Sequence, residues 1–225
     1  MELKESTLSI LKNFASINPN IVIAEGNTLK TITEAKNVLA TATVEESFPK
    51  TVGIYDLSEF LGVLSLVDSP KLEFNDDFAL VSDSSGRSKV KYFFSDIEML
   101  TAPSKDITMP SEDVKFTLDA GTLSKLKRAS STLGHSEVSV KAVSEGIIEL
   151  SIIDNQNATS NTFSIQVDGE YTEANFNFIL NINNMKIIDG DYDVAISSKL
   201  ISNFVNKGVS IQYWIALEKS STFGA

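Results

Sequence analysis

The stretch TLSILKNFAS, residues 7–16, returns later in the chain as TLSKLKRASS, residues 122–131. Six of the ten positions are identical, and the second copy begins about half a chain length after the first, in a chain of 225 residues. A segment repeated at such an offset is typical of a duplicated structural unit. Each half, at roughly 110 residues, is long enough to bury a core of its own. The sequence therefore predicts two domains built in the same order.

The first half reads as helix, strands, helix, strands. Apolar residues at helical spacing predict helices over residues 3–17 and 55–67. Between them, alternating apolar positions predict strands over 21–24 and 28–33, joined as a hairpin across Glu25-Gly26-Asn27.

The second half repeats this order. Asp119 is a suitable cap for a helix that runs to about Leu133 and stops at Gly134. A hairpin turn is expected at Ser144-Glu145-Gly146, and a short helix over Asn181–Ile188. The segment between the halves, TAPSKDITMPSED, has two prolines, small polar residues and little periodicity. We therefore expect domains at 1–100 and 114–225, with a connector at 101–113.

The chemical inventory argues against an enzyme. The chain has no cysteine and a single histidine, His135, which the sequence places just after a helix end as a solvated residue. A cysteine nucleophile, a disulfide and a cysteine-based zinc site are thus excluded. No P-loop and no dinucleotide fingerprint is present. The sequence predicts no catalytic residue, no metal and no cofactor.

The positive residues suggest contact with nucleic acid. The net charge is −11, so a protein of this composition is repelled by DNA unless its cations are gathered on one face. The repeated helices carry cations beside serine and threonine, without the side chains that read base edges. We expect contact with phosphates that is indifferent to base sequence. The candidate DNA-binding residues are Lys4, Lys12, Lys125, Lys127 and Arg128.

Four longer segments resemble the DNA polymerase sliding clamps of T-even-type tailed phages, and the resemblance extends over essentially the whole chain. They are ILKNFASIN (Ile10–Asn18), YDLSEFLGVLSLV (Tyr55–Val67), FNFILNINNMKI (Phe176–Ile187) and YWIALEKSST (Tyr213–Thr222).

The resemblance implies an α+β fold, the DNA clamp fold, in which two topologically similar domains each contribute two helices to a pore. Three copies would close into a ring around duplex DNA. It further implies loading by a clamp-loader ATPase, tethering of the replicative DNA polymerase, a role in late transcription with its factors, and a location in the cytoplasm of the infected bacterium. No membrane partner is expected.

Two further surfaces follow from the resemblance. Partner proteins of this family insert apolar C-terminal tails near the connector, where we place the following residues: Ile107, Met109, Pro110, Trp214, Ile215 and Leu217. Subunits of a ring join head to tail, and edge strands join readily because their backbone groups lack partners. We expect Arg87–Phe94 to meet Thr159–Val167 of a neighbour, through Arg87, Val90, Tyr92, Phe163 and Ile165.

Two other hypotheses remain open. A monomeric, sequence-nonspecific DNA-binding protein would share the basic helices but form no ring. An enzyme that uses a metal held at Asp189, Asp191 and Asp193 would depend on those carboxylates more than on the cations, although a turn explains them as well.

Overall fold

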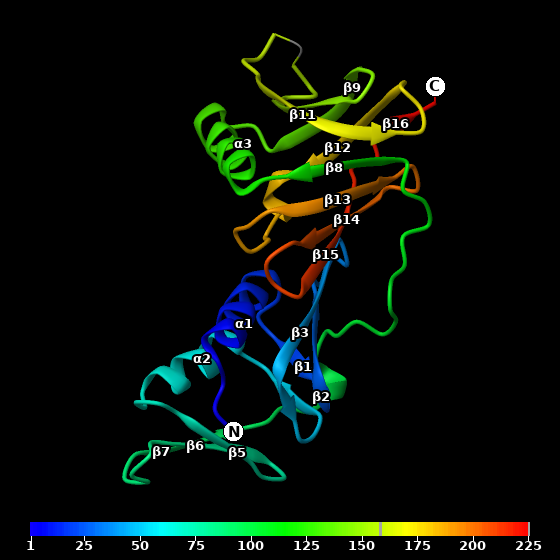
Figure 1. Ribbon diagram of the computed structural model, residues 1–225. Coiled ribbons are helices and arrows are strands. Elements are labelled where there is room, and N and C mark those ends of the chain that lie inside the picture. Colours follow the sequence, from blue (N-terminus) through cyan, green and yellow to red (C-terminus); the bar gives the residue numbers. More distant parts are fainter. Residues whose placement is uncertain (158, 225) are drawn as a thin grey trace. The chain divides into compact units, whose positions relative to one another are not determined.

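The computed structural model describes residues 1–157 and 159–224, and it divides into two compact units (Figure 1). The first ends at Asp106 and the second begins at Ile107. This division falls within residues 101–113, which contain no helix or strand. None of the described helices is both long and apolar enough to cross a bilayer.

The first unit holds two helices and seven strands. They are α1 (Glu5–Ile17), β1 (Ile21–Ile23), β2 (Gly26–Ile32), β3 (Val38–Phe48), β4 (Val52–Ile54), α2 (Leu57–Ser65), β5 (Lys71–Phe74), β6 (Phe78–Ser82) and β7 (Lys89–Phe93), followed by the 3-10 turn η1 (Ile97–Met99). α1 packs against α2 and β3 and buries Leu11 and Phe14 completely.

Strand pairing in the first unit corrects the sequence prediction. β1 pairs with β4 and β2 with β3, both antiparallel, while β5, β6 and β7 form a separate sheet. The hairpin expected across Glu25-Gly26-Asn27 is therefore wrong. Gly26 is itself the first residue of β2, with a positive φ of 106°, and it faces Phe48 of β3 across a register irregularity. A bulge bends the strand locally and increases its twist.

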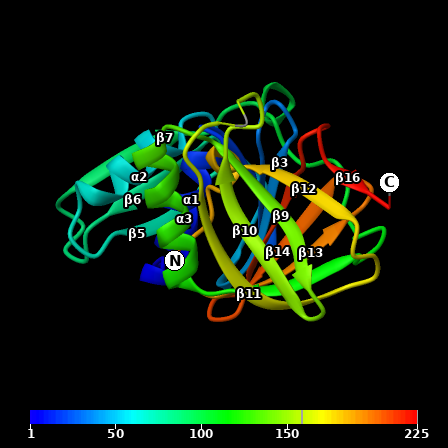
Figure 2. The same cartoon turned by 90° about the horizontal axis from the view of Figure 1, so that it is seen from above.

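The second unit is richer in strands. It contains β8 (Val114–Leu118), α3 (Ala120–Leu133), β9 (Glu137–Ser144), β10 (Ile147–Ile153), β11 (Phe163–Tyr171), β12 (Phe176–Asn181), η2 (Ile182–Asn184), β13 (Tyr192–Ser197), β14 (Ile201–Asn206), β15 (Ile211–Ala216) and β16 (Thr222–Phe223). Within this unit the strands follow one another in the order β16-β12-β9-β10-β11-β8-β13-β14-β15. Figure 2 shows β9, β10 and β11 running side by side.

The second unit confirms the expected hairpin at residues 144–146, where β9 turns into β10. The helix expected over Asn181–Ile188 is wrong beyond Asn184, because the structure contains only the single 3-10 turn η2. The side chains of Ile182, Met185 and Ile187 are all buried in the core. The conformation of this segment is therefore determined by core packing and not by helical periodicity.

The two units correspond in topology. The pairs β1–β4 and β2–β3 match β9–β12 and β10–β11, and the sheet β5-β6-β7 matches β13-β14-β15. The units differ in two ways. β9 pairs with β10, whereas β1 and β2 do not pair, and β8 pairs with both β11 and β13 and joins the two parts of the second unit. In the first unit the corresponding place, against β5, is taken by Met1, which exchanges backbone hydrogen bonds of 2.7 Å with Leu72.

Candidate nucleic-acid interface

Helix α1 presents one free cation on its exposed side. Its buried face contains Ile10, Leu11 and Phe14 at helical spacing, which leaves Lys12 exposed on the other side. Lys12 takes part in no ion pair among the described residues. Its ammonium group is thus free to meet an external anion.

Lys4 differs from Lys12, although both were expected to contact DNA. It precedes the helix as its N-cap residue, and its ammonium group forms an ion pair with Glu45 of β3. The hydrogen bond from Lys4 to Glu45 and the charge of that carboxylate raise the pKa of Lys4. A cation that is already paired offers little attraction to phosphate, so Lys4 is the weakest of the candidates.

Helix α3 is the more basic of the two repeated helices. Lys125 and Arg128 are exposed and Lys127 is half-buried, and none of them is in an ion pair among the described residues. Residues 120–133 contain no acidic side chain. The helix ends at Gly134, whose φ of 73° lies in the left-handed region.

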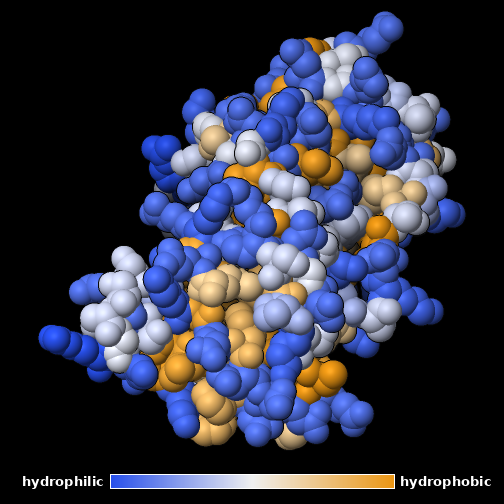
Figure 3. All heavy atoms as spheres, turned by 60° about the horizontal axis from the view of Figure 1, so that its bottom comes forward, coloured by the Kyte–Doolittle hydropathy of each residue, from blue (hydrophilic) through white to orange (hydrophobic). Residues whose placement is uncertain are grey.

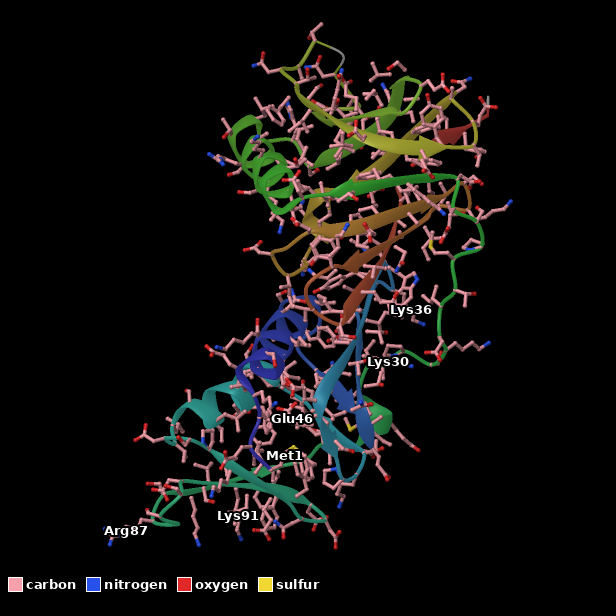
Figure 4. The ribbon with its side chains drawn as sticks, viewed as in Figure 1. Met1, Lys30, Lys36, Glu46, Arg87 and Lys91 are labelled. Atoms are coloured by element: carbon pink, nitrogen blue, oxygen red, sulfur yellow. The ribbon has the colours of Figure 1, made fainter. Side chains whose placement is uncertain are left out.

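The repeated threonines Thr7 and Thr122 anchor the starts of these helices to carboxylates. The Thr7 hydroxyl donates to Glu46 of β3 at 2.6 Å, and the Thr122 hydroxyl donates to Asp119 at 2.7 Å. The Thr122 backbone N–H also donates to Asp119, at 2.8 Å. Figure 4 shows Glu46 on β3, on the side toward α1.

Both carboxylates are held in their charged forms. Hydrogen bonds from Thr122 lower the pKa of Asp119. Burial acts to raise the pKa of Glu46, but hydrogen bonds from the Thr7 hydroxyl and the Lys4 N–H outweigh it, so this pKa is lowered too. Each anion therefore stabilises the helix start that it contacts.

An apolar groove of about 420 Å³ lies beside α3. Its walls come from α3 and from the start of β11, and the residues are Lys125, Arg128, Ala129, Thr132, Leu133, Thr162 and Phe163. Ala129 and Leu133 are half-buried where they border this groove.

The strands expected at a subunit interface have unpaired edges. β7 pairs only with β6, and residues 163–168 of β11 pair only with β10, among the described residues. Val90, Phe163 and Ile165 are half-buried. Arg87 lies at one end of the β5-β6-β7 sheet in Figure 4, and the Lys91 ammonium group lies over the Phe78 ring of β6, 4.7 Å from its centroid.

Large apolar side chains are exposed mainly in the first unit. Tyr55, Leu66, Phe93 and Met99 are each more than half exposed, whereas the large apolar side chains exposed among the described residues of the second unit are those of Val143, Val205 and Val209. Figure 3 shows hydrophobic residues gathered among hydrophilic ones on the lower part of the face that it presents. Exposed apolar surface of this kind is typical of a region that another chain covers.

Tyr92 belongs to the core of the first unit. Its ring lies edge-on to Phe60 of α2, with 5.1 Å between the ring centroids, and its hydroxyl donates to the Asp56 carbonyl at 3.1 Å. Tyr92 therefore ties β7 to α2. Its side chain thus supports the packing of β7 and is not free on the surface.

The residues expected to receive partner tails have mixed exposure. Trp214, Ile215 and Leu217 are buried, whereas Ile107 and Met109 are half-buried and Pro110 is exposed. The groove beside α3 contains none of these residues. The buried indole Nε1 of Trp214 has no hydrogen-bond partner in the part of the chain that the structure describes.

The described residues include no group of three or more histidine, aspartate or glutamate side chains arranged to hold a metal ion. Asp191 lies just before β13, and Asp193 is the second residue of that strand. Asp191 accepts from the Ala120 N–H at 2.8 Å, and Asp193 forms an ion pair with Lys207 at 3.1 Å. These contacts favour a structural role for both carboxylates.

Known proteins resemble the chain at the levels of sequence and fold. Residues 4–93 match the family described as DNA polymerase processivity factor, and residues 115–219 match the C-terminal domain of the gp45 sliding clamp. The chain is 35% identical to the sliding clamp of Vibrio phage KVP40 over 97% of its length and 99% of that protein. It is 31% identical to the sliding clamp of Escherichia phage RB69 and 30% identical to that of Enterobacteria phage T4, over 99% of both chains in each case.

Solved structures of cellular clamps share the fold. The proliferating cellular nuclear antigen of Entamoeba histolytica gives a TM-score of 0.67 at 14% identity, over 96% of this chain and 97% of the other. A PCNA2–PCNA3 complex from Sulfolobus tokodaii gives 0.66 at 15% identity, over 97% and 99%. One family model matches each unit, and the phage relatives align with the chain from end to end. The chain therefore belongs to the phage sliding clamp family of DNA polymerase processivity factors.

Proposed function

We propose that this protein is a sliding clamp, which encircles duplex DNA as a ring of three copies and tethers the replicative DNA polymerase. The observation that carries the proposal is the duplicated unit with its repeated helices, α1 and α3. Both helices have exposed cations that form no ion pair among the described residues. The kinship with phage clamps supports it.

DNA contact would be electrostatic and weak. A ring of three copies carries about −33, three times the −11 of one chain. Duplex DNA is repelled by such a protein except where Lys12, Lys127 and the other cations of α3 face it. Contacts to phosphates alone do not fix a position on the sequence, so the ring can slide. Encirclement then supplies the processivity, and the protein itself acts without catalysis.

Ring closure would use the free edges of β7 and β11. The exposed residues on β7 include Lys89 and Lys91, and those on the matching face of β11 include Gln166 and Asp168. Pairing these edges in antiparallel fashion would satisfy backbone groups that lack partners in one chain. It would also bring Arg87 and its neighbouring cations toward the acidic end of β11.

Partner proteins would bind near the connector at 101–113, between the domains proposed at 1–100 and 114–225. An apolar tail would lie against Ile107, Met109 and Pro110, which are half-buried or exposed apolar residues of the connector. The polymerase, a clamp loader and late-transcription factors would compete for this place in the cytoplasm of the infected bacterium.

The decisive experiment measures absolute mass by light scattering over a dilution series, followed by retention of the protein on circular and linear DNA. A mass of three chains, together with retention on circles and loss from linear ends, supports the clamp. A strict monomer at high concentration would overturn the ring. The cations of α1 and α3 would then serve an ordinary nonspecific DNA-binding surface.

A further inference from the structure

The sheet β5-β6-β7 buries one of its faces and leaves the other exposed. Ala79, Val81 and Tyr92 are buried on the inner face. The alternate residues of β6 and β7 point the other way, because successive side chains of a strand lie on opposite faces. These outer-face residues are Phe78, Leu80, Ser82, Lys89, Lys91 and Phe93, and none of them is buried.

Two aromatic rings lie side by side on this outer face. Phe78 of β6 is opposite Phe93 of β7 in the strand register, and their ring centroids are 5.7 Å apart. Phe93 is 65% exposed, although phenylalanine is among the residues most often buried. Its ring is therefore accessible to another flat group that could stack on it.

Cations accompany the two rings. Lys89 and Lys91 are exposed on β7, and Arg87 is exposed just before that strand. None of the three forms an ion pair among the described residues. The Lys91 ammonium group lies over the Phe78 ring of the neighbouring strand, so it extends across the sheet and not toward the free edge of β7. Pairing of that edge would leave the Lys91 charge on the outer face.

The carboxylates close to the outer face lie at its ends and on β5. They are Glu73 on β5, Asp76 and Asp77 in the turn between β5 and β6, and Asp83 in the turn between β6 and β7, where it accepts from the Arg87 N–H. None of them forms an ion pair with Lys89 or Lys91. The middle of the face is therefore positive in a chain whose net charge is −11, and charge complementarity favours an anionic partner.

We infer that the outer face of β6 and β7 binds single-stranded nucleic acid, with a base stacked on Phe93 and phosphates at Lys89 and Lys91. Aromatic rings beside cations are the features with which proteins bind unpaired strands of any sequence. Alternate residues of a strand are about 7 Å apart, so the two lysines can follow an extended backbone while the ring takes a base.

This site differs from the duplex contacts proposed for α1 and α3. Bases inside a duplex are stacked on one another and cannot reach the Phe93 ring, so the outer face should discriminate against duplex DNA. The whole site lies within one chain, and it does not require the ring.

The first test measures the fluorescence anisotropy of a labelled oligothymidine. Phe93→Leu keeps an apolar side chain and should weaken binding about tenfold, through the loss of one base–aromatic stack. Tyr55→Leu is the matched control, because Tyr55 is a 67% exposed aromatic residue outside this face, and it should bind as the wild type does. Phe93→Trp should retain the affinity. Its exposed indole should also be quenched by the bound base, whereas Trp214, the only tryptophan of the chain, is buried.

The second test removes a cation. Lys91→Gln should reduce the slope of log affinity against log salt by about 0.7, the value for one phosphate of a single strand. Lys36→Gln makes the same change in net charge in the turn between β2 and β3, which Figure 4 shows away from the β5-β6-β7 sheet. It should leave the slope unchanged. Oligouridine is measured in parallel, and the tighter of the two strands identifies the kind of nucleic acid that the site prefers.

Three outcomes would overturn this inference. They are equal effects of Phe93→Leu and Tyr55→Leu, displacement of oligothymidine by a blunt duplex as effectively as by unlabelled oligothymidine, and binding of an acidic, phenylalanine-containing peptide to this face in place of oligothymidine. The ring is judged separately. A monomeric wild-type protein that still shows the expected losses leaves the inference standing while the ring fails. Retention of Phe93→Leu on circular DNA with weakened oligothymidine binding supports both.

Discussion

Helices α1 and α3 carry the same sequence repeat, yet their first turns are held in different ways. At α3 the anchor is local, since Asp119 immediately precedes the helix and accepts from both the hydroxyl and the N–H of Thr122. At α1 the anchor comes from a distant part of the sequence, since Glu46 of β3 accepts from the Thr7 hydroxyl and from the Lys4 N–H. The threonine is thus repeated in the sequence, whereas its carboxylate partner precedes the helix in one unit and lies on strand β3 in the other.

The strand β8 explains this difference. In the second unit β8 leads directly into α3, so the residue between them, Asp119, is fixed by the sheet and can act as a cap. In the first unit residues 1–4 form no strand, and Lys4 offers no side-chain cap. β3 is long, running from Val38 to Phe48, and its Glu46 supplies the anion instead. The comparison shows that both copies of the helix use a carboxylate to anchor the first turn, although the carboxylate comes from a different element in each unit.

The largest expected effect concerns the strand that distinguishes the second unit. At Gly169, β11 passes from β10 to β8, and an added Cβ would lie 2.7 Å from the Lys115 carbonyl oxygen and 2.3 Å from Ile148 Cδ1. Because a backbone atom cannot move aside freely, Gly169→Ala should lower the free energy of unfolding by about 1–3 kcal/mol. Urea unfolding measures the change, and hydrogen exchange should locate it at β8 and β11.

Gly208→Ala is the matched control for Gly169→Ala, because the nearest atom to its added Cβ is 3.7 Å away. It should change the stability by no more than about 0.5 kcal/mol. Equal effects of the two substitutions would mean that the close approach of β8 and β11 does not constrain the second unit.

The next largest effect contrasts the two anchors. Glu46→Ala leaves the Thr7 hydroxyl without its partner at a fully buried position and should cost about 1–3 kcal/mol. Asp119→Ala should cost about 0.5–2 kcal/mol, as is usual when a helix cap is removed. Chemical denaturation of the single variants gives both values.

Conservative variants sharpen that contrast. Asp119→Asn should retain most of the stability, because asparagine is also a good cap in the same position. Glu46→Asp should behave nearly like Glu46→Ala, because the shorter side chain no longer reaches from β3 to both Lys4 and Thr7. Rescue by aspartate at position 46 would show that the distance across the unit is not the constraint.

The sequence predicted the features that depend on local signals. The repeat, the helix from Asp119 to Gly134 and the turn at residues 144–146 all follow from caps, periodicity and turn residues close together in the chain. The resemblance to phage clamps predicted the family. Lys12, Lys125, Lys127 and Arg128 remain predicted DNA contacts, and the structure leaves them without ion pairs among the described residues.

Features that depend on partners distant in sequence were missed. Glu45 and Glu46 stand in a strand and give no local sign that one neutralises Lys4 and the other holds Thr7. The hairpin expected at Gly26 fails for the same reason, since the choice of β3 over β1 as partner is made by tertiary packing.

A smaller effect is expected from pH. The pKa of Glu46 is lowered in the folded chain, so its contribution to stability is present above the ordinary pKa of a glutamate and is lost as the pH falls through the lowered value. The stability difference between the wild type and Glu46→Gln should therefore be constant near neutral pH and should shrink as the pH falls below the ordinary pKa of a glutamate. Urea midpoints measured over this range test the sign. A difference that grows at low pH would contradict it.

The smallest effect compares the matched cations of the repeat, Lys12 and Lys127. Each is free of ion pairs among the described residues, so Lys12→Ala and Lys127→Ala should each reduce the slope of log affinity against log salt, by about 0.9 for each phosphate that the variant no longer neutralises. Lys4→Ala should leave the slope unchanged, because its charge is already paired with Glu45. Nonspecific binding of short duplexes at several salt concentrations provides the measurement. Should Lys4→Ala reduce the slope as much as Lys12→Ala, the ion pair with Glu45 must open when DNA binds, and the first turns of the two helices would then contribute to DNA binding more equally than their anchors suggest.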